Sequence, residues 1–476
     1  MPRLYDGAPT SPSKMTRHRS SKHVLSILSI PVLFSAVSVG ARGQESDSAI
    51  RAILQERVAS KRAVGLVVGV LENGQRKIFV AGTADAPGVA LDGNTVFEIG
   101  SITKVFTASL LADMVARGEV KLDDPVAKYL PASVRIPTRN GKQITLLDLA
   151  TQSSGLPRMP TNFTPKDQNN PYADYTVDQM YAFLSNYQLP RDIGAKYEYS
   201  NLGVGLLGHA LSLRAGKSYE ALVTERILKP LGMNDTKITL DQSARAHLAR
   251  GHSETGAPVA NWDLPTLAGA GALRSTVNDL FKFLAANLDT SSKPLGPVLA
   301  TTHFARRDAD GQRMRIGLNW HILNAFDRPL VWHNGGTGGY RTFIGMDAAR
   351  QRAVIVLSNQ ATAPDDIGFH LLDARAPLAP APKVRTAIAV DPAVLESYVG
   401  VYPLAPNFAL TITREGASLF GQATGQPKFE LFAESTTEFF LKVVDAQVTF
   451  EKDATGKVTG LVLHQGGMNL PGARTK

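Results

Sequence analysis

The chain has 476 residues, 43% of them hydrophobic and 20% charged, which is the balance of a globular protein long enough for roughly two or three structural units. Its 51 Lys and Arg against 42 Asp and Glu give a formal net charge of +9. Because the basic residues after the N-terminus are dispersed and form no stripe interleaved with aromatic residues, we expect no nucleic-acid partner. The sequence has no cysteine, which excludes disulfides, a cysteine nucleophile and thiolate metal sites.

Residues 1–43 have the pattern of an export signal. Several basic side chains and a single acidic one precede an apolar run from Leu25 to Val39. Pro31 interrupts this run, which is short for a membrane span, and Val39-Gly40-Ala41 offers small residues for cleavage. We predict a signal peptide with an N-terminal extension, a periplasmic or secreted protein, and no stable membrane span after cleavage. An uncleaved N-terminal anchor is the alternative.

The folded part opens with two β-rich runs, from Ala63 to Val70 and from Gln75 to Ala81. The pair Asn73-Gly74 stands between them and favours the left-handed backbone of a two-residue turn. We therefore predict an antiparallel hairpin at the start of this part.

A hydroxyl and an amine stand three residues apart at Ser101 and Lys104, where a run of apolar residues at helical spacing begins. The spacing predicts a helix from Ser101 to Arg117 with both side chains on one face. Ser101 would lie in the first turn, where unpaired N–H groups and the positive end of the dipole suit a developing oxyanion. The pattern alone is weak, because Ser11 and Lys14 have the same spacing.

The segment from Ile144 to about Thr290 is mainly helical in its periodicity, and β-rich runs return after Gly311. The predicted helices after Arg117 are Val126–Leu130, Leu146–Ala150, Val177–Ser185, Leu202–Ala215, Tyr219–Ile227 and Val277–Leu288, the last with a capping box between Thr276 and Asp279. The predicted later strands are Arg315–Asn319, Thr342–Asp347 and Ala353–Leu357. Strands at both ends of a helical insert predict a mostly antiparallel sheet, a helical lobe and a cleft between them.

Residues 374–390 form a predicted linker, because three prolines among alanines between Ala374 and Pro382 favour a semi-rigid connector. Short β-rich runs follow within residues 391–476: Ala409–Arg414, Ser418–Gln422, Phe429–Ala433, Glu438–Val443, Val448–Lys452 and Val458–His464. These runs predict a small antiparallel barrel or sandwich as a separate domain.

Two more polar clusters follow Ser101: Tyr199-Ser200-Asn201, and the glycine-rich stretch from His333 to Gly339 just before a predicted strand. In this order, and with ITLLDLATQSSGLP from Ile144 to Pro157 between the first two, the motifs FEIGSITK, YSN and HNGGTGG resemble the class C β-lactamase and penicillin-binding serine hydrolase family. The resemblance runs from about Ala49 to Asp373. The terminal domain resembles the lipocalin-like appendages of some family members.

This resemblance implies a fold of class α/β (α+β), serine β-lactamase/DD-peptidase-like. The catalytic domain, residues 44–373, would have an antiparallel sheet flanked by helices plus an all-helical lobe, and a small all-β domain would follow. Carried over by motif, the site consists of the nucleophile Ser101, the proton-handling pair Lys104 and Tyr199, Asn201 as a polar anchor for the substrate's amide, and His333, Gly335 and Gly336 as substrate-binding residues, with Gly336 giving the second oxyanion N–H.

One position departs from the commonest family pattern, which has Lys-Thr-Gly where this chain has His333-Asn334-Gly335. An imidazole is neutral much of the time near pH 7, so it would bind a substrate carboxylate less firmly than lysine and do less to lower the pKa of Tyr199. A structural histidine at a strand edge is the alternative for His333, and a core aromatic residue with a bonded hydroxyl is the alternative for Tyr199.

We expect an exported serine hydrolase that works through a Ser101 acyl-enzyme, first of all a class C β-lactamase-type enzyme hydrolysing β-lactam amides. The same residues would serve a D-alanyl-D-alanine carboxypeptidase/endopeptidase or a carboxylesterase. A non-catalytic penicillin- or peptidoglycan-binding protein is the alternative from another class. The expected partners are therefore small molecules: a β-lactam, a peptidoglycan peptide or an ester. We expect no cofactor and no metal, because Asp123-Asp124 and Asp365-Asp366 have no histidine cluster to complete a site.

Overall fold

The computed structural model describes residues 45–291, 295–309, 311, 313–381, 385–405, 408–444, 446–465 and 468–475. The predicted signal peptide and extension over residues 1–43 lie outside this part of the chain. In the described part, no helix is both long and apolar enough to cross a membrane.

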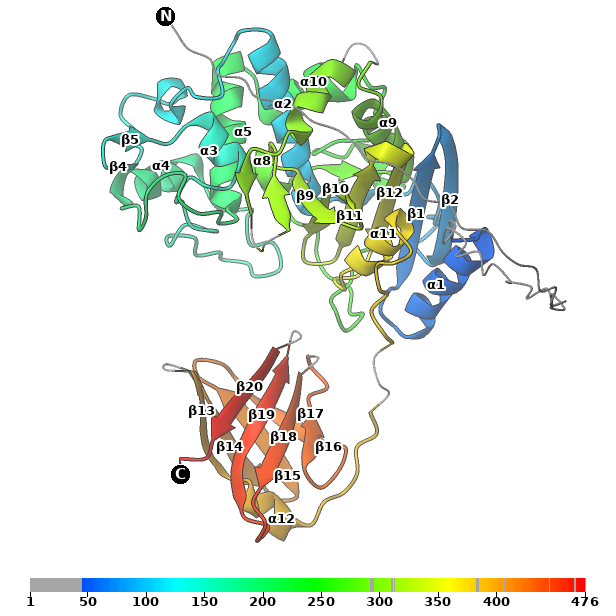
Figure 1. Cartoon of the computed structure of the whole chain (residues 1–476), viewed down its shortest axis with the longest axis vertical. Coiled ribbons are helices and arrows are strands. Elements are labelled where there is room, and N and C mark those ends of the chain that lie inside the picture. Colours follow the sequence, from blue (N-terminus) through cyan, green and yellow to red (C-terminus); the bar gives the residue numbers. More distant parts are fainter. Residues whose placement is uncertain are drawn as a thin grey trace, which may run out of the picture. The chain divides into compact units, whose positions relative to one another are not determined.

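The first large sheet has eight antiparallel strands in the order β2-β1-β12-β11-β10-β9-β8-β7. They are β1 (Gly65–Glu72), β2 (Gln75–Gly82), β7 (Arg307–Asp308), β8 (Met314–Ile316), β9 (His321–Ala325), β10 (Arg328–Gly336), β11 (Arg341–Asp347) and β12 (Arg352–Ser358). Strands from both ends of the helical insert therefore pair in one sheet, as the sequence predicts (Figure 1). The predicted hairpin is confirmed, because Glu72 pairs with Gln75 across Asn73 and Gly74, whose φ angles are +48° and +81°.

Alternate residues of the strands face two separate cores. On one face, Leu66, Val68 and Val354 pack with residues of the helices α1 (Asp47–Ala59) and α11 (Asp365–Leu372). On the other face, Val67 and Ile355 join the large core of the helical insert. The period of two in the strands thus places apolar side chains on both faces, which is why these strands read as continuous hydrophobic runs.

The helical insert surrounds α2 (Thr103–Ala116), which is buried along most of its length. The other helices of the insert are α3 (Leu146–Ala150), α4 (Val177–Asn186), α5 (Asn201–Ala215), α6 (Tyr219–Val223), which continues as a π-helical turn over Thr224–Leu228, α7 (Gln242–Arg245), α8 (Ala268–Gly271), α9 (Val277–Leu288) and α10 (Gly296–Ala300). Two short ladders, β3 (Phe97–Glu98) with β6 (Arg274–Ser275) and β4 (Thr138–Arg139) with β5 (Lys142–Gln143), complete it.

Three local predictions were wrong. The strand predicted over Arg315–Asn319 is shorter, because Asn319 has a φ of +56°, which extended backbone does not adopt. The predicted capping box of α9 is only half formed: Thr276 caps the helix, but the Asp279 carboxylate accepts hydrogen bonds from Asp235 N and Thr236 Oγ1 at 2.8 and 2.9 Å. The strand predicted over Glu438–Val443 is also shorter, because it ends at Phe440.

The C-terminal region is a separate antiparallel sheet of eight strands in chain order. They are β13 (Gly400–Ala405), β14 (Phe408–Glu415), β15 (Ser418–Ala423), β16 (Lys428–Ala433), β17 (Glu438–Phe440), β18 (Ala446–Lys452), β19 (Val458–Gln465) and β20 (Met468–Ala473), preceded by α12 (Pro392–Ser397). Thr475 N–H donates to the carbonyl of Val401 at 2.9 Å, so the last strand meets the first and the sheet nearly closes into a barrel. This agrees with the predicted small β domain.

Candidate active site

Ser101 lies in a short 3₁₀ turn (Gly100–Ile102) that leads directly into α2. The end of β10 packs against this turn. A Cβ on Gly335 would stand 2.0 Å from the carbonyl oxygen of Ile99, and a Cβ on Gly100 would stand 2.6 Å from Gly336 N. Only glycine allows such a close approach, and Gly100 also needs its φ of +50°. The predicted nucleophile and the predicted oxyanion donor Gly336 are therefore brought together by close backbone packing.

Lys104 is fully buried at 0% exposure, one turn after Ser101. Its Nζ lies 3.0 Å from Ser101 Oγ, 2.9 Å from Asn201 Oδ1 and 2.7 Å from the carbonyl oxygen of Ala270 in α8. Two of these partners, an amide oxygen and a backbone carbonyl, can only accept hydrogen bonds. A neutral amine has two N–H donors and one lone pair, so two donors for these acceptors leave the lone pair toward the Ser101 hydroxyl.

The environment favours that neutral amine. Burial holds the pKa of Lys104 well below its usual value, and the positive charge of Arg158 lowers this pKa further. Taking an ammonium group out of water costs several kcal/mol, so a buried lysine without a carboxylate partner loses its proton readily. Lys104 is thus placed and tuned to take a proton from Ser101.

The carbonyls of α8 that face α2 are held by a second contact. Thr107, one turn after Lys104, donates from Oγ1 to the carbonyl of Gly269 at 2.7 Å. Because the hydroxyl proton of Thr107 is used in this hydrogen bond, the Tyr219 hydroxyl, 2.7 Å from Thr107 Oγ1, is the donor to Thr107. Lys104 and Thr107 therefore bind the consecutive carbonyls of Gly269 and Ala270.

Tyr199 and Asn201 flank the start of α5, and the loop after α3 holds them in place. Ser200 caps α5, donates from Oγ to the carbonyl of Pro157 at 2.6 Å, and donates its N–H to Gln152 Oε1 at 2.8 Å. Gln152 adopts a φ of +55° to do so. The stretch TQSSGLP, which the sequence connects with the motifs, is thus the support of Tyr199-Ser200-Asn201.

Tyr199 is half-buried, and its ring centroid lies 4.8 Å from Lys104 Nζ. Burial raises its pKa to about 12, opposed by a hydrogen bond with Ser101 and by the charge of Arg158. The phenol is therefore protonated at neutral pH. It can give a proton to a leaving group more readily than it can take one from Ser101.

His333 is fully buried at 0% exposure. Its Nδ1–H donates a hydrogen bond to the carbonyl of Asn334 at 2.6 Å, and its Nε2 has no partner among the described residues. Burial, His321 and Lys104 lower its pKa well below the usual value, so the ring is neutral. Its centroid is 6.4 Å from that of Tyr199. His333 therefore lies near the other predicted residues, but it is an uncharged side chain.

The outer edge of β10 is open beside Ser101. β10 pairs with β9 only over Arg328–Trp332, whereas its pairing with β11 continues to Gly336. The backbone from His333 to Gly336 therefore has one edge without a neighbouring strand, and Gly336 itself is exposed. An extended substrate could hydrogen-bond along this edge.

Three participants were not predicted from the sequence: the Ala270 carbonyl, Gln152 and Arg158. A backbone carbonyl leaves no signature in a sequence. Gln152 lies within the quoted TQSSGLP stretch, which was the only signal for it. Arg158 follows that stretch by one residue, and its Cζ lies 5.0 Å from the ring centroid of Tyr199.

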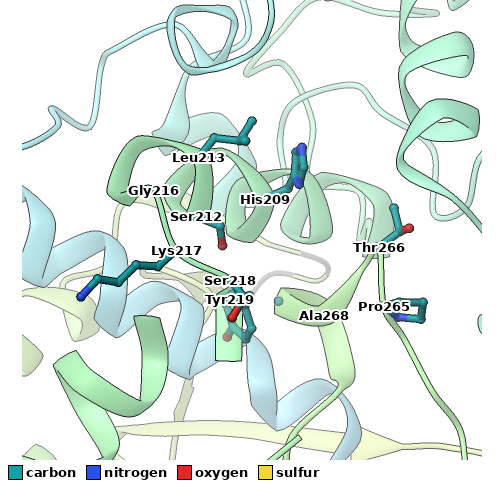
Figure 2. Close-up of a pocket in the computed structure, with 11 residues that line it drawn as sticks. His209, Ser212, Leu213, Gly216, Lys217, Ser218, Tyr219, Pro265, Thr266 and Ala268 are labelled. Atoms are coloured by element: carbon teal, nitrogen blue, oxygen red, sulfur yellow. The ribbon is translucent and has the colours of Figure 1, made fainter. Parts of the chain in front are cut away.

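A cavity of about 400 Å³ is lined in part by Ala268 and Gly269 of α8. Figure 2 shows it between α5, the start of α6 and the segment 265–269, with Tyr219 and Ser212 among its lining side chains. None of the predicted site residues lines it. In the described part of the chain, no cluster of three or more His, Asp or Glu residues could hold a metal ion.

Known proteins resemble the chain in both regions. A family model described as Beta-lactamase matches residues 50–376, and one described as a domain of unknown function (DUF3471) matches residues 384–472. A "Beta-lactamase" of Pseudomonas fluorescens is 28% identical over 67% of this chain and 93% of its own length. The "D-alanyl-D-alanine-carboxypeptidase/endopeptidase AmpH" of Escherichia coli K12 is 32% identical over 60% of this chain and 76% of its own length.

Solved structures agree on the fold. The crystal structure of a "Beta-lactamase/D-alanine Carboxypeptidase" from Yersinia pestis in complex with citrate is 27% identical, covers 70% of this chain and 99% of its own, and superposes with a TM-score of 0.59. A class C β-lactamase structure from Rhodobacter sphaeroides is 25% identical, covers 68% of this chain and 99% of its own, and gives a TM-score of 0.57. With a family match from residue 50 to residue 376 and this shared fold, the chain belongs to the Beta-lactamase family of serine β-lactamases and DD-carboxypeptidases and carries a C-terminal DUF3471 domain.

Proposed function

We propose that this protein is an exported serine hydrolase that forms an acyl-enzyme at Ser101 and hydrolyses β-lactam amides. The observation that carries the proposal is the contact of 3.0 Å between Lys104 Nζ and Ser101 Oγ, with the amine's other partners able only to accept. A nucleophile within hydrogen-bond reach of a neutral base is the arrangement that activates serine.

The acylation step follows from this geometry. Ser101 Oγ attacks the carbonyl carbon of the substrate while its proton passes to Lys104 Nζ. The N–H groups of Ser101 and Gly336 face the oxygen that becomes negative. The bond from carbon to the leaving nitrogen then breaks, and the protonated Tyr199 supplies the proton that this nitrogen needs. The proton held by Lys104 restores the phenol.

Deacylation reverses these roles with water as the nucleophile. A water molecule gives its proton to the pair, its oxygen bonds to the acyl carbon, and the ester bond to Ser101 Oγ breaks as the oxygen is reprotonated. General acid–base catalysis of this kind contributes about 10²–10⁴-fold in rate. Neither step needs a cofactor.

A D-alanyl-D-alanine carboxypeptidase or endopeptidase is the second candidate. Two observations favour it: the 32% identical relative has this activity in its name, and the neutral His333 departs from the commonest Lys-Thr-Gly pattern. A carboxylesterase would use the same residues. A non-catalytic penicillin-binding protein would be acylated without turnover.

A substrate panel separates these functions. Wild-type protein and Ser101→Ala are assayed with nitrocefin, a peptide ending in D-alanyl-D-alanine, and p-nitrophenyl butyrate, and intact mass is measured after penicillin. The proposal expects turnover of nitrocefin above the other two in kcat/KM. Faster release of D-alanine would favour the second candidate, and a stable adduct without product would favour the binder. Unchanged turnover in Ser101→Ala would contradict the nucleophile.

Export is the further part of this proposal and rests on residues 1–43 alone. The mature N-terminus of protein from the cell envelope or the culture medium tests it. Cleavage near residues 39–44 is expected. Full-length protein that stays in the membrane fraction would instead support an uncleaved anchor.

A further inference from the structure

Arg158 lies beside Tyr199 and forms no ion pair among the described residues. Its backbone carbonyl accepts from the N–H groups of Asn201 and Leu202 at 3.0 and 3.3 Å, which ties it to the start of α5. Its guanidinium is exposed and lies 5.0 Å from the ring centroid of Tyr199. Within the described ranges, no carboxylate lies within 4.0 Å of it and its side chain makes no hydrogen bond.

The other titratable groups around Lys104 are uncharged. Tyr199, under the amine, and the nearby Tyr172 both have a pKa raised by burial. His333 on β10 has a pKa well below its usual value, and burial lowers that of His321 on β9 to about 4. From α8 the contact is a backbone carbonyl. Among these described neighbours, the Arg158 guanidinium is the group that keeps a full charge at every pH of interest.

We propose that Arg158 supplies a fixed positive charge beside Tyr199 and Lys104: it holds Lys104 in the neutral form that accepts a proton, and it attracts substrates that bear a carboxylate close to the scissile bond. In the commonest family pattern a strand lysine has this role, and His333 stands in its place in this chain. Arg158 lies in the loop that supports α5, with its Cζ 5.0 Å from the ring centroid of Tyr199, where it can take that role. This inference rests on the proposed function.

Charge and position explain both effects. Arg158 Cζ and Lys104 Nζ lie 5.0 and 4.8 Å from the same ring centroid of Tyr199. A fixed positive charge this near an amine disfavours the ammonium form, and the charge of Arg158 acts to lower the pKa of Lys104, Tyr199 and Tyr172 alike. Because Arg158 is exposed and has no carboxylate of the described residues beside it, its guanidinium N–H donors are available to an incoming anion. Arginine also binds carboxylates in a bidentate manner, which fixes their orientation as well as their charge.

The test compares the wild type with Arg158→Gln, Arg158→Lys and a matched control, Arg51→Gln. Arg51 is also exposed and also lies over an aromatic ring, with its Cζ 5.3 Å from the centroid of Phe79, but on α1. The kcat/KM of each protein is measured from pH 5 to 9 with two substrates: one carrying a carboxylate, such as nitrocefin, and the neutral p-nitrophenyl butyrate. The pH dependence of Ser101 labelling by a neutral fluorophosphonate is measured in parallel.

For Arg158→Gln we expect the acid limb of both the hydrolysis and the labelling profiles to move up by roughly half to one pH unit, because removing the cation raises the pKa of Lys104. The KM for nitrocefin should rise about tenfold, and that for the neutral ester less than about twofold, the size expected for one lost charge contact. Arg158→Lys should restore the limb, and Arg51→Gln should change neither.

Failure of the proposed function and failure of the inference on Arg158 give different results. If the wild type hydrolyses neither substrate, the proposed function fails, and the labelling profile still tests the effect of Arg158 on Lys104. If the wild type is active or labelled and Arg158→Gln keeps its acid limb and its preference for the anionic substrate, the inference on Arg158 is wrong. A loss of rate at all pH values without a shift of the limb would show a purely structural role, and would also overturn it.

Discussion

The two folded regions of this chain bury different chemistry. In the sheet-and-helix region the core encloses Lys104, His333 and other polar groups, and apart from tyrosines every buried polar or charged side chain of the described residues lies between Arg57 and Asp373. The barrel core is apolar apart from tyrosines, whose hydroxyls donate to backbone carbonyls, as Tyr402 does to Tyr398 at 2.8 Å. Burying a lysine costs stability, whereas burying apolar side chains contributes to it. This difference places the proposed catalysis in the sheet-and-helix region.

The comparison also gives the barrel a simple role. Its described residues offer no buried nucleophile or base, and its His464 lies on the strand β19, where the ring bonds Thr449 and Asn469. Substitutions in the barrel should therefore change stability alone. Those in the first region should change chemistry, in some cases with a gain in stability.

Lys104→Met is expected to have the largest effect. Removing the base should lower kcat/KM by about 10²–10⁴-fold, while the melting temperature stays the same or rises because a buried amine is replaced by an apolar chain of similar size. Steady-state kinetics and thermal unfolding measure the two. Lys128→Met, an exposed lysine paired with Asp124, is the control. A large loss of stability in Lys104→Met would show that the lysine is mainly structural.

Gly335→Ala and Gly421→Ala compare a close backbone contact beside Ser101 with an ordinary glycine position in the barrel. The new Cβ would stand 2.0 Å from Ile99 O, so the end of β10 must move away from Ser101, and activity should fall by about two orders of magnitude, as for other misplaced catalytic groups. In the barrel, a Cβ on Gly421 would meet only side chains, at 3.3 Å or more. Gly421→Ala should keep full activity. Equal activity of the two variants would contradict the packing described here.

Phe450→Ala should destabilise the barrel and leave the chemistry intact. Phe450 is 3% exposed and stacks on Tyr398 with centroids 4.0 Å apart. Its truncation should cost about 3–5 kcal/mol. Urea unfolding followed in the barrel should shift accordingly, while kcat/KM of the folded first region is unchanged. A matching loss of kcat/KM would show that the barrel shapes the site.

Asp365→Asn is expected to have the smallest effect of these variants. It should change only the stability of the sheet-and-helix region. Burial raises the pKa of Asp365 to about 6, above its value in the unfolded chain. The folded state therefore holds this proton more tightly, and stability falls as the pH rises from about 4 to 6. The amide should stabilise the protein by about 1–2 kcal/mol above pH 7, since the site is partly solvated, and have little effect at pH 4. Thermal unfolding at both pH values checks this, and equal effects at both would contradict it.

The sequence predicted what is encoded locally. The spacing of Ser101 and Lys104 at a helix start and the Asn73-Gly74 turn depend on neighbours in the chain, and both features are present in the structure. The β9–β10 hairpin was missed because its turn, Phe326-Asp327, has φ angles of +54° and +65°, which such residues rarely adopt. Pro329 inside β10 is also untypical of a strand.

The site could be predicted only as far as motifs reach. The Ala270 carbonyl and the cation of Arg158 act on Lys104 from residues 166 and 54 positions away in the chain, and neither belongs to a pattern of residue types. The sequence shows an imidazole at His333 in place of the lysine of the commonest family pattern, but the full burial of His333 depends on how β9 and β10 pack. Long-range placement, rather than composition, decides the electrostatics of this site.

The most direct test of the account is the site of acylation. The wild type and Ser101→Ala are treated with a fluorophosphonate and, separately, with penicillin, and the adducts are located by intact mass and peptide mapping. We predict one adduct per chain, on Ser101, that forms faster as the pH rises through the lowered pKa of Lys104 and is absent from the variant. An adduct on another residue, or one that persists in Ser101→Ala, would contradict the account.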